Sequence, residues 1–246
     1  MTSYPEIALV QGMSFLAKAQ ETIAHNLANI DTRGFKRQVA VAQTSQREFQ
    51  NVLGERMQTI AFEQHTDWSE GNPLQTGSNL DVMLGEGTAF RVQDKQGRTY
   101  YTRDGQLNVD QNGALINSTG MRYLDPNGNA IVLSQEEMNP NEMSIMPNGQ
   151  ISNPATGVTV GSLGIFRLPA GDSVTPVGRG LYQDQLDRSP EAVRKGLQQG
   201  YREASNVDSL QEMVQMIFVQ RSFNATQKAL GSLGRMQSQL IQNANR

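Results

Sequence analysis

Groups able to do chemistry are few in this chain of 246 residues. Its two histidines are His25 and His65, and it has no cysteine. A zinc site needs three or four ligands at suitable spacing, and a serine nucleophile needs a histidine base, commonly beside a Gly-x-Ser-x-Gly turn that this sequence lacks. We therefore predict no catalytic residue, no metal site and no cofactor, and we expect that the chain is not an enzyme.

Three aspartates are the remaining candidates for acid–base catalysis. Asp104 precedes Gly105, Asp110 lies shortly before Gly113, and Asp125 opens an Asp-Pro-Asn-Gly sequence. Aspartate is favoured at such places because its carboxylate accepts hydrogen bonds from the turn backbone. We interpret all three as turn residues. The enzyme alternative predicts instead that changing Asp104 or Asp125 abolishes an activity.

Two other motifs resemble ligand-binding sequences. Gly85-Glu86-Gly87 begins like a dinucleotide-binding loop, but Phe90 occupies the place of the third glycine. Arg33, Lys36 and Arg37 form a small basic cluster in a chain whose formal net charge is −3. Nucleic-acid binding requires a wider basic surface, so we expect this cluster to be a solvated face or an interface salt bridge.

The middle of the chain has the pattern of β-structure. Strand-length runs recur about ten residues apart, separated by turns such as Asp94-Lys95-Gln96-Gly97 and Asn112-Gly113, which is typical of antiparallel hairpins in a sandwich or barrel-like domain. The predicted strands are residues 80–84, 89–93, 99–103, 107–109, 114–116, 130–133 and 163–168.

The two ends of the chain have helical periodicity. The first predicted helix starts near Pro5 and ends at 31–34, where Gly34 can adopt a positive φ, and its apolar seam includes one polar member, Gln20. The second runs from Val207 to Gln242 after a Ser205–Ser209 start signal. Both stripes follow the spacing of three and four that coiled coils use. We predict an assembly interface formed by Leu9, Met13, Leu16, Ile23, Leu27, Ile30, Val214, Ile217, Val219, Phe223, Leu230 and Leu233.

These patterns together predict an α+β fold, mostly β, in which terminal helices flank an antiparallel central domain and pair as a coiled coil. The expected divisions are an N-terminal helix and exit motif (1–36), an extended arm (37–77), a β-rich domain (78–168), a connection of loop and β-structure (169–204) and a C-terminal helix (205–246). No run approaches the roughly 18 apolar residues that span a bilayer, and the N-terminus lacks a secretory signal pattern. We expect a protein that is not membrane-embedded and that either stays inside the cell or leaves it by another route.

Three motifs carry a resemblance to a known family. Residues 26–37, Asn-Leu-Ala-Asn-Ile-Asp-Thr-Arg-Gly-Phe-Lys-Arg, resemble the N-terminal signature of bacterial flagellar rod and hook proteins, which is close to Asn-x-Ala-Asn-x-x-Thr-x-Gly-Phe-Lys. Residues 102–107 with 112–115 and Gly120 are similar to that family's central motif, and residues 200–223 to its C-terminal signature. The matching positions of the first motif are Asn26, Ala28, Asn29, Thr32, Gly34, Phe35 and Lys36.

The resemblance implies a structural subunit of the flagellar basal-body rod. Such proteins are exported through the flagellar type III apparatus without a cleaved signal peptide and polymerise in the periplasm. The implied partners are further copies of the chain, other rod and hook-side axial proteins, and the export apparatus. Nucleic acid is not among them.

The position within the rod is left open between the proximal rod protein that has a β-domain and the distal rod protein, with the proximal one favoured. The family usually has Gly-Asp-Gly-Phe-Phe after the Leu-Asp-Val-type strand, whereas this chain has Gly85-Glu86-Gly87-Thr88-Ala89-Phe90. That departure and the modest length favour the proximal member. The alternative from another class is a soluble β-domain that binds a peptide or sugar, with the end helices packed on its own body.

Overall fold

The computed structural model describes residues 4–45, 59–134, 143–154, 157–168, 174–186, 191–194 and 196–244. The chain divides into two compact units, each built from separate stretches of sequence. One unit, called the helical unit here, comprises Met1–Ala28, Gln38–His65 and Asp208–Arg246. The other, called the β-rich unit, comprises Asn29–Arg37 and Thr66–Val207.

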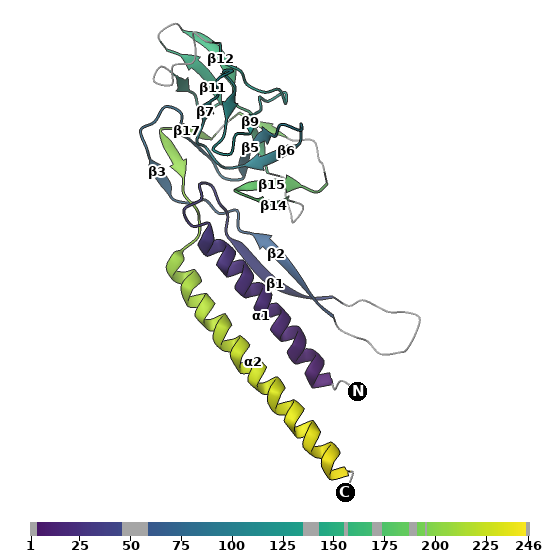
Figure 1. Ribbon diagram of the computed structural model, residues 1–246. Coiled ribbons are helices and arrows are strands. Elements are labelled where there is room, and N and C mark those ends of the chain that lie inside the picture. Colours follow the sequence, from purple (N-terminus) through teal and green to yellow (C-terminus); the bar gives the residue numbers. More distant parts are fainter. Residues whose placement is uncertain are drawn as a thin grey trace. The chain divides into compact units, whose positions relative to one another are not determined.

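The helical unit contains two long helices that contact each other, α1 (Tyr4–Ala28) and α2 (Ser209–Ala244). They lie side by side and run in opposite directions, so that the two chain ends lie at the same end of the pair (Figure 1). At 1.5 Å per residue, α2 is about 54 Å long and extends well past the roughly 38 Å of α1. α2 begins where sequence predicted, because the Asp208 carboxylate accepts hydrogen bonds from the backbone N–H groups of Leu210 (2.9 Å) and Gln211 (3.1 Å).

A two-stranded sheet of β1 (Gln38–Ser45) and β2 (Thr59–Thr66) completes the helical unit. β1 packs against α1, and the rings of Phe15 in α1 and Phe62 in β2 stack with centroids 5.6 Å apart. The Gln64 side chain donates a hydrogen bond to the Thr22 hydroxyl at 2.9 Å. α1 therefore has packing partners in α2 and in both strands.

The largest sheet of the β-rich unit has nine strands, ordered β14-β15-β6-β5-β9-β8-β7, with β13 pairing with β5 and with β16. Its pairs are antiparallel, for example Val92 opposite Tyr100 between β5 and β6. These strands are β5 (Thr88–Gln93), β6 (Thr99–Thr102), β7 (Asn108–Val109), β8 (Leu115–Ile116), β9 (Arg122–Tyr123), β13 (Ile165–Arg167), β14 (Val174–Gly178), β15 (Leu181–Asp184) and β16 (Ala192–Val193).

Three smaller antiparallel sheets accompany it. One has the order β10-β11-β12, and two are pairs, β17 with β4 and β18 with β3. Their strands are β3 (Pro73–Gln75), β4 (Val82–Leu84), β10 (Ser144–Ile145), β11 (Gln150–Asn153), β12 (Val158–Ser162), β17 (Leu197–Gln199) and β18 (Tyr201–Glu203). The pairs β17–β4 and β18–β3 bring residues 197–203, which precede α2, alongside residues 73–84.

The core of the β-rich unit forms around apolar side chains that face inward from these short strands. Phe90 and Tyr123 are fully buried and meet edge to face with centroids 5.4 Å apart. Glycines close the turns between strands, as at Gly113, where φ is +80°. Burial of such apolar faces supplies most of the free energy that stabilises a unit built from short strands.

The coarse fold class is confirmed, because the described chain is mostly β with a helix at each end and antiparallel sheets. Most predicted strands form, but residues 130–133 contribute only isolated bridges, Leu124 with Ala130 and Ala114 with Val132. α1 ends at Ala28, earlier than expected. Gly34 does adopt a positive φ of +61°, in the turn that follows the helix rather than at its end.

Candidate assembly interface

The C-terminal helix α2 has apolar side chains on two opposite faces. Half-buried residues define the first face, and α1 contacts this helix. At 3.6 residues per turn, the exposed residues of the N-terminal half lie on roughly the opposite side. We call this second face the outer stripe; its members are Leu210, Met213, Val214, Ile217 and Phe218. Phe218 is 64% exposed and Val214 44% exposed, so the outer stripe is unpartnered within the described chain.

The predicted interface residues differ in how far they are buried. On α1, Ile23 is buried. Leu9, Met13, Leu16 and Leu27 are half-buried. On α2, the half-buried members are Val219, Phe223, Leu230 and Leu233. Val214 and Ile217 belong to the outer stripe, and Ile30 is half-buried in the β-rich unit.

A buried polar contact ties the start of α2 to the end of α1 within the helical unit. The Asn26 side chain donates to the Gln38 carbonyl at 2.8 Å and accepts from the Gln38 N–H at 2.9 Å. Its amide nitrogen also lies 3.3 Å from a carboxylate oxygen of Glu212 in the first turn of α2. All three residues are buried. Asn26 therefore replaces a strand partner for Gln38 and links α1, β1 and α2.

Residues 29–37 of the N-terminal motif lie in the β-rich unit, where residues 34–37 form a hydrogen-bonded ladder with the segment before α2. Gly34 N–H donates to the Glu203 carbonyl at 3.1 Å, and Arg37 N–H donates to the Asn206 side chain at 2.7 Å. Asp67 N–H donates to the Arg37 carbonyl at 2.8 Å. Residues 34–37 therefore bond both to Asp67 and to residues 203–206, which follow much later in the sequence.

The remaining motif residues shape the turn before this ladder. Thr32 N–H donates to the Asn29 carbonyl at 3.0 Å, and the Thr32 hydroxyl lies 3.2 Å from the Asn29 side-chain oxygen. Ala28 is exposed at the end of α1. Phe35 is 3% exposed. A Cβ atom at Gly34 would approach the Arg103 carbonyl carbon and oxygen to 2.6 Å, so this position requires glycine for space as well as for its positive φ.

The centre of the ladder is a buried ionic triad of Lys36, Glu203 and Arg103. Lys36 Nζ lies 2.6 Å from one Glu203 carboxylate oxygen, and Arg103 Nε lies 2.5 Å from the other. Lys36 Nζ also donates to the Ser69 carbonyl at 2.5 Å. All three side chains are at most 1% exposed. Two cations therefore share one carboxylate in the interior.

The excess of one positive charge in the triad affects the pKa of Lys36. Burial lowers the pKa of Lys36, and the neighbouring Arg103 charge lowers it further, while Glu203 opposes both effects. Burial also raises the pKa of the Tyr182 phenol, whose oxygen accepts a hydrogen bond from the Lys36 N–H at 3.0 Å. Removing one partner from such a buried pair leaves an uncompensated charge and is strongly destabilising.

Arg103 also fixes the turn whose sequence departs from the family pattern. Its guanidinium donates to three carbonyl oxygens around that turn: Thr88 at 2.5 Å, Gly85 at 3.1 Å and Leu84 at 3.1 Å. Glu203 orients the guanidinium from the other side. The turn at 85–88 is therefore positioned through Arg103 by the same carboxylate that neutralises Lys36.

The candidate carboxylates occupy turns, as the sequence predicts. Asp110 accepts from the N–H groups of Asn112 and Ala114, both at 2.8 Å. Asp125 accepts from two turn N–H groups in the same way. Asp104 is buried and accepts from the Gln106 N–H at 3.1 Å and from a serine hydroxyl. The turn interpretation is confirmed for all three.

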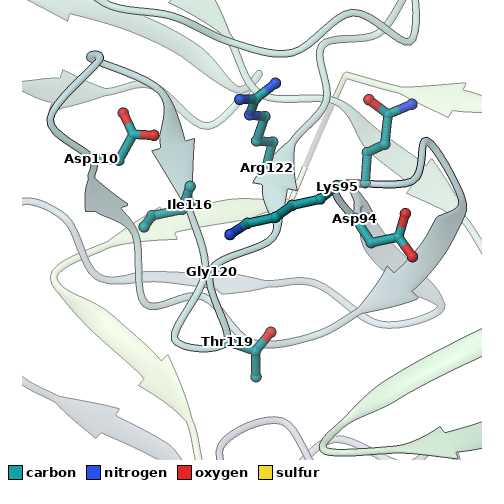
Figure 2. A pocket seen from close by; sticks show the side chains of 8 residues that line it. Asp94, Lys95, Asp110, Ile116, Thr119, Gly120 and Arg122 are labelled. Carbon is teal, nitrogen blue, oxygen red and sulfur yellow. The ribbon is translucent and has the colours of Figure 1, made fainter.

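The β-rich unit has a pocket of about 320 Å³ at the C-terminal end of β5, and four of its lining residues are charged (Figure 2). The Lys95 side chain reaches across it from the β5–β6 turn, and Arg122 comes from β9. Among the described residues, no group of three or more His, Cys, Asp or Glu side chains is placed to hold a metal ion. No helix in the described ranges is long and apolar enough to cross a membrane.

The ionic triad is the feature that reasoning from sequence missed. Lys36 was expected on a solvated face or in an interface salt bridge, but it is fully buried and its ion pair lies inside the β-rich unit. The available signal was a charged residue beside an aromatic one, Phe35, in a segment where Gly34 forces a turn. Nothing in the sequence pairs it with Glu203, which lies 167 positions later.

Comparisons with known proteins match the segments that meet in this network. Three family descriptions match in chain order: "Flagella basal body rod protein" over residues 8–36, "Flagellar hook protein FlgE/F/G D1 domain" over 84–165, and "Flagellar basal body rod FlgEFG protein C-terminal" over 198–243. The flagellar basal-body rod protein FlgG of Buchnera aphidicola subsp. Acyrthosiphon pisum is 31% identical over 248 residues, covering 89% of this chain and 92% of that protein. The chain belongs to the flagellar basal-body rod protein family.

Other rod proteins match over nearly the whole length. FlgF of Caulobacter vibrioides is 26% identical over 96% of both chains, and FlgG of Bacillus subtilis is 27% identical over 94% of this chain and 96% of its own. This rod protein is thus a structural subunit of the flagellar basal body. The relatives include both FlgF and FlgG, so they do not decide between the proximal and distal positions. The alternative of a self-contained binding module gives way to the family assignment.

Proposed function

We propose that this rod subunit polymerises through its terminal helices, which pair as coiled coils with neighbouring copies in the axial rod. The observation that carries the proposal is the outer stripe of α2. A helix in a self-contained protein has one apolar face, whereas α2 has a second one on the side opposite its half-buried face. The outer stripe supplies a surface that a neighbouring subunit can cover.

The energetics favour a partner over solvent exposure. Five large apolar side chains form the outer stripe over residues 210–218, and complete burial of such a side chain stabilises by about 1.5–3 kcal/mol. Side-chain ordering and the loss of translational freedom oppose this gain. In a polymer the same contact repeats at each subunit, so even a modest surplus per contact favours growth of an existing rod.

The C-terminal part of α2 adds to the polymer contact. α2 has 36 residues and α1 has 25, and Met236 and Leu240 are exposed near the end of α2. Their spacing of four continues the coiled-coil pattern of the sequence. We infer that helices of other subunits cover these residues.

We propose the export route and the location on the basis of the family. The chain passes through the flagellar type III export apparatus without cleavage of a signal peptide and assembles in the periplasm with copies of itself and with other rod and hook-side axial proteins. Membership of the rod protein family supports this part of the proposal.

We propose that this chain lies in the proximal segment of the rod. The chain is short at 246 residues, and its turn at Gly85–Phe90 departs from the usual family sequence. Rods stalled before the distal segment is built separate the two positions. A proximal subunit is present in such stalled rods, whereas a distal subunit is absent from them.

Isolated basal bodies test the proposed function. Cells that lack the chain are expected to be non-motile, and restoring an epitope-tagged chain should restore swimming and place the tag in purified hook–basal-body particles. The proposal fails if tagged cells swim while the purified particles contain none of the chain.

A further inference from the structure

The pocket at the end of β5 has one positive charge more than its surroundings balance. Its charged lining residues are Asp94, Lys95, Asp110 and Arg122. Asp94 is paired with Arg98, which is not a lining residue, at 2.7 Å. Asp110 has one carboxylate oxygen engaged by two turn N–H groups. Two cations therefore face a single remaining carboxylate.

In the described part of the chain, the charged ends of Lys95 and Arg122 are both unpaired. Within the described part of the chain, Lys95 and Arg122 make no ion pair or hydrogen bond through their charged ends. Figure 2 shows the Lys95 ammonium reaching over the pocket near Ile116 and Gly120, while the Asp94 carboxylate points away from it. One additional carboxylate would balance the pocket.

A matching carboxylate lies at the opposite end of the same strand. Glu86 is exposed at the tip of the turn that precedes β5, and in the described ranges it has no ion pair. The backbone on both sides of Glu86 is held by Arg103 through the carbonyls of Gly85 and Thr88. A carboxylate on a turn fixed in this way loses little conformational entropy when it binds.

The two features cannot meet within one molecule. β5 spans six residues, Thr88–Gln93, and a strand rises about 3.3 Å per residue, so the turn and the pocket are separated by roughly 20 Å. Two copies arranged head to tail can join them, and a contact between different surfaces of identical subunits can repeat along an open helix. That is the symmetry a rod requires.

We propose that Glu86 of one subunit binds between Lys95 and Arg122 of the next, so that the β-rich units form a head-to-tail contact in addition to the helix contact. This inference rests on the proposed function, because it takes the neighbour to be a second copy of the chain. The contact also gives a role to the turn whose sequence departs from the family pattern.

Zero-length carbodiimide cross-linking of isolated basal bodies tests the inference with native residues. The reagent joins a carboxylate to an amine that touches it, and mass spectrometry should identify a peptide linking Glu86 to Lys95. An intramolecular link is ruled out by the strand length, so this peptide reports two subunits. Lys95→Arg keeps the charge but removes the amine that the reagent needs, so the Glu86–Lys95 peptide should disappear from basal bodies that still contain the chain.

Charge reversal gives an independent readout. Glu86→Lys should lower the amount of chain in basal bodies about fivefold, as expected for loss of an ion pair at an interface. Adding Lys95→Glu should restore it, because the lysine at position 86 then faces two carboxylates beside Arg122 and the charges balance again. Asp31→Lys is the matched control, because Asp31 is also exposed and lies outside both features; incorporation of this variant should be unchanged.

The outcomes separate this inference from the proposed function. Basal bodies that contain the chain and yield other cross-links, but no Glu86–Lys95 peptide, overturn the head-to-tail contact alone. Failure of Lys95→Glu to restore the incorporation of Glu86→Lys counts against it equally. Absence of the wild-type chain from the particles overturns the proposed function and this contact with it.

Discussion

Glu203 is the residue on which the interior of the β-rich unit most depends, because its carboxylate bonds to Lys36, to Arg103 and to the Gly71 N–H at 2.9 Å. Glu203→Gln keeps the shape of the side chain and removes the charge. We predict that it lowers the free energy of unfolding by about 3–5 kcal/mol, the cost of leaving buried cations unpaired. Trp68, the one tryptophan, packs against Tyr182 at 4.8 Å and reports unfolding by fluorescence in denaturant titrations.

The matched control for that substitution is Glu191→Gln. Glu191 pairs with Arg167 at 3.1 Å, but both side chains are more than 60% exposed. Exposed pairs contribute at most about 1 kcal/mol, so this variant should unfold at nearly the wild-type denaturant concentration. Equal effects of the two substitutions would show that the buried triad has no special role.

Gly34 gives a second prediction at the residue scale. Its φ of +61° and the 2.6 Å approach to the Arg103 backbone mean that Gly34→Ala must strain or displace the ladder. We expect a loss of at least about 1–3 kcal/mol. Gly12→Ala in α1 is the control, since a Cβ there meets nothing within 4 Å and should stabilise the helix by about 1 kcal/mol. Thermal unfolding by circular dichroism separates the two, and a neutral Gly34→Ala would contradict the steric argument.

Phe35 and Lys36 show where sequence reasoning stops. The motif that contains them indicates the family, yet their burial arises from contacts with residues 203–206, which no local pattern connects to them. A lysine in an acidic protein is normally solvated, and only the folded chain provides Glu203 as a partner. Because Phe35 is buried in the β-rich unit, its substitution tests folding as well as assembly.

At the scale of elements, the two apolar faces of α2 allow packing within the subunit to be tested separately from assembly of the rod. Val214→Asp together with Phe218→Asp places charge on the outer stripe, where both side chains are substantially exposed. We predict a folded chain whose incorporation into basal bodies falls below about one tenth of wild type, because a buried unpaired charge costs several kcal/mol at each contact. Immunoblots of purified particles measure the incorporated amount.

Gln220→Asp is the control for this pair, since Gln220 is an exposed polar residue on the flank of α2. It adds one negative charge, against two in the double variant, without removing an apolar side chain, and should leave incorporation close to normal. Motile cells that incorporate the double variant at the wild-type level would exclude the outer stripe from the rod contact.

The helices and most strands were predictable because their signals are local. Spacing of three and four identifies both helices, and Asp208 identifies the start of α2 through its cap. The sequence did not predict which apolar residues of α2 lie on which of its two faces. Val214 and Val219 belong to one continuous sequence pattern, yet the first lies on the outer stripe and the second on the half-buried face. Which apolar stripe is covered depends on the partner, and a single sequence does not encode that directly.

At the scale of the whole molecule, each unit is built from both ends of the chain. The helical unit combines Met1–Ala28 with Asp208–Arg246, and the β-rich unit combines Asn29–Arg37 with the segment that ends at Val207. Neither unit can therefore complete its contacts until the last third of the chain is present. The arrangement links the two family motifs through hydrogen bonds in both units, by Asn26 in one and by Gly34 and Arg37 in the other.

Acid should weaken the β-rich unit. In Asp67 and Asp125, burial alone would raise the pKa, but hydrogen bonds from the neighbouring turn outweigh it and hold the pKa below the ordinary value of 3.8. Carboxylates with a lowered pKa in the folded state stabilise above 3.8, and this contribution is lost as the pH falls through their folded-state pKa. We expect the urea midpoint of Trp68 fluorescence to fall between pH 4 and pH 2, and Asp125→Asn to show a shallower decline. A midpoint that stays constant or rises contradicts this assignment.

Thiol labelling at Val214 shows directly whether the rod buries the outer stripe. The chain has no cysteine, so Val214→Cys introduces a unique site. We predict rapid maleimide labelling of the purified monomer, labelling at least about tenfold slower in isolated basal bodies, and rapid labelling again once the particles are dissociated. Labelling at the same rate in monomer and basal body would contradict it.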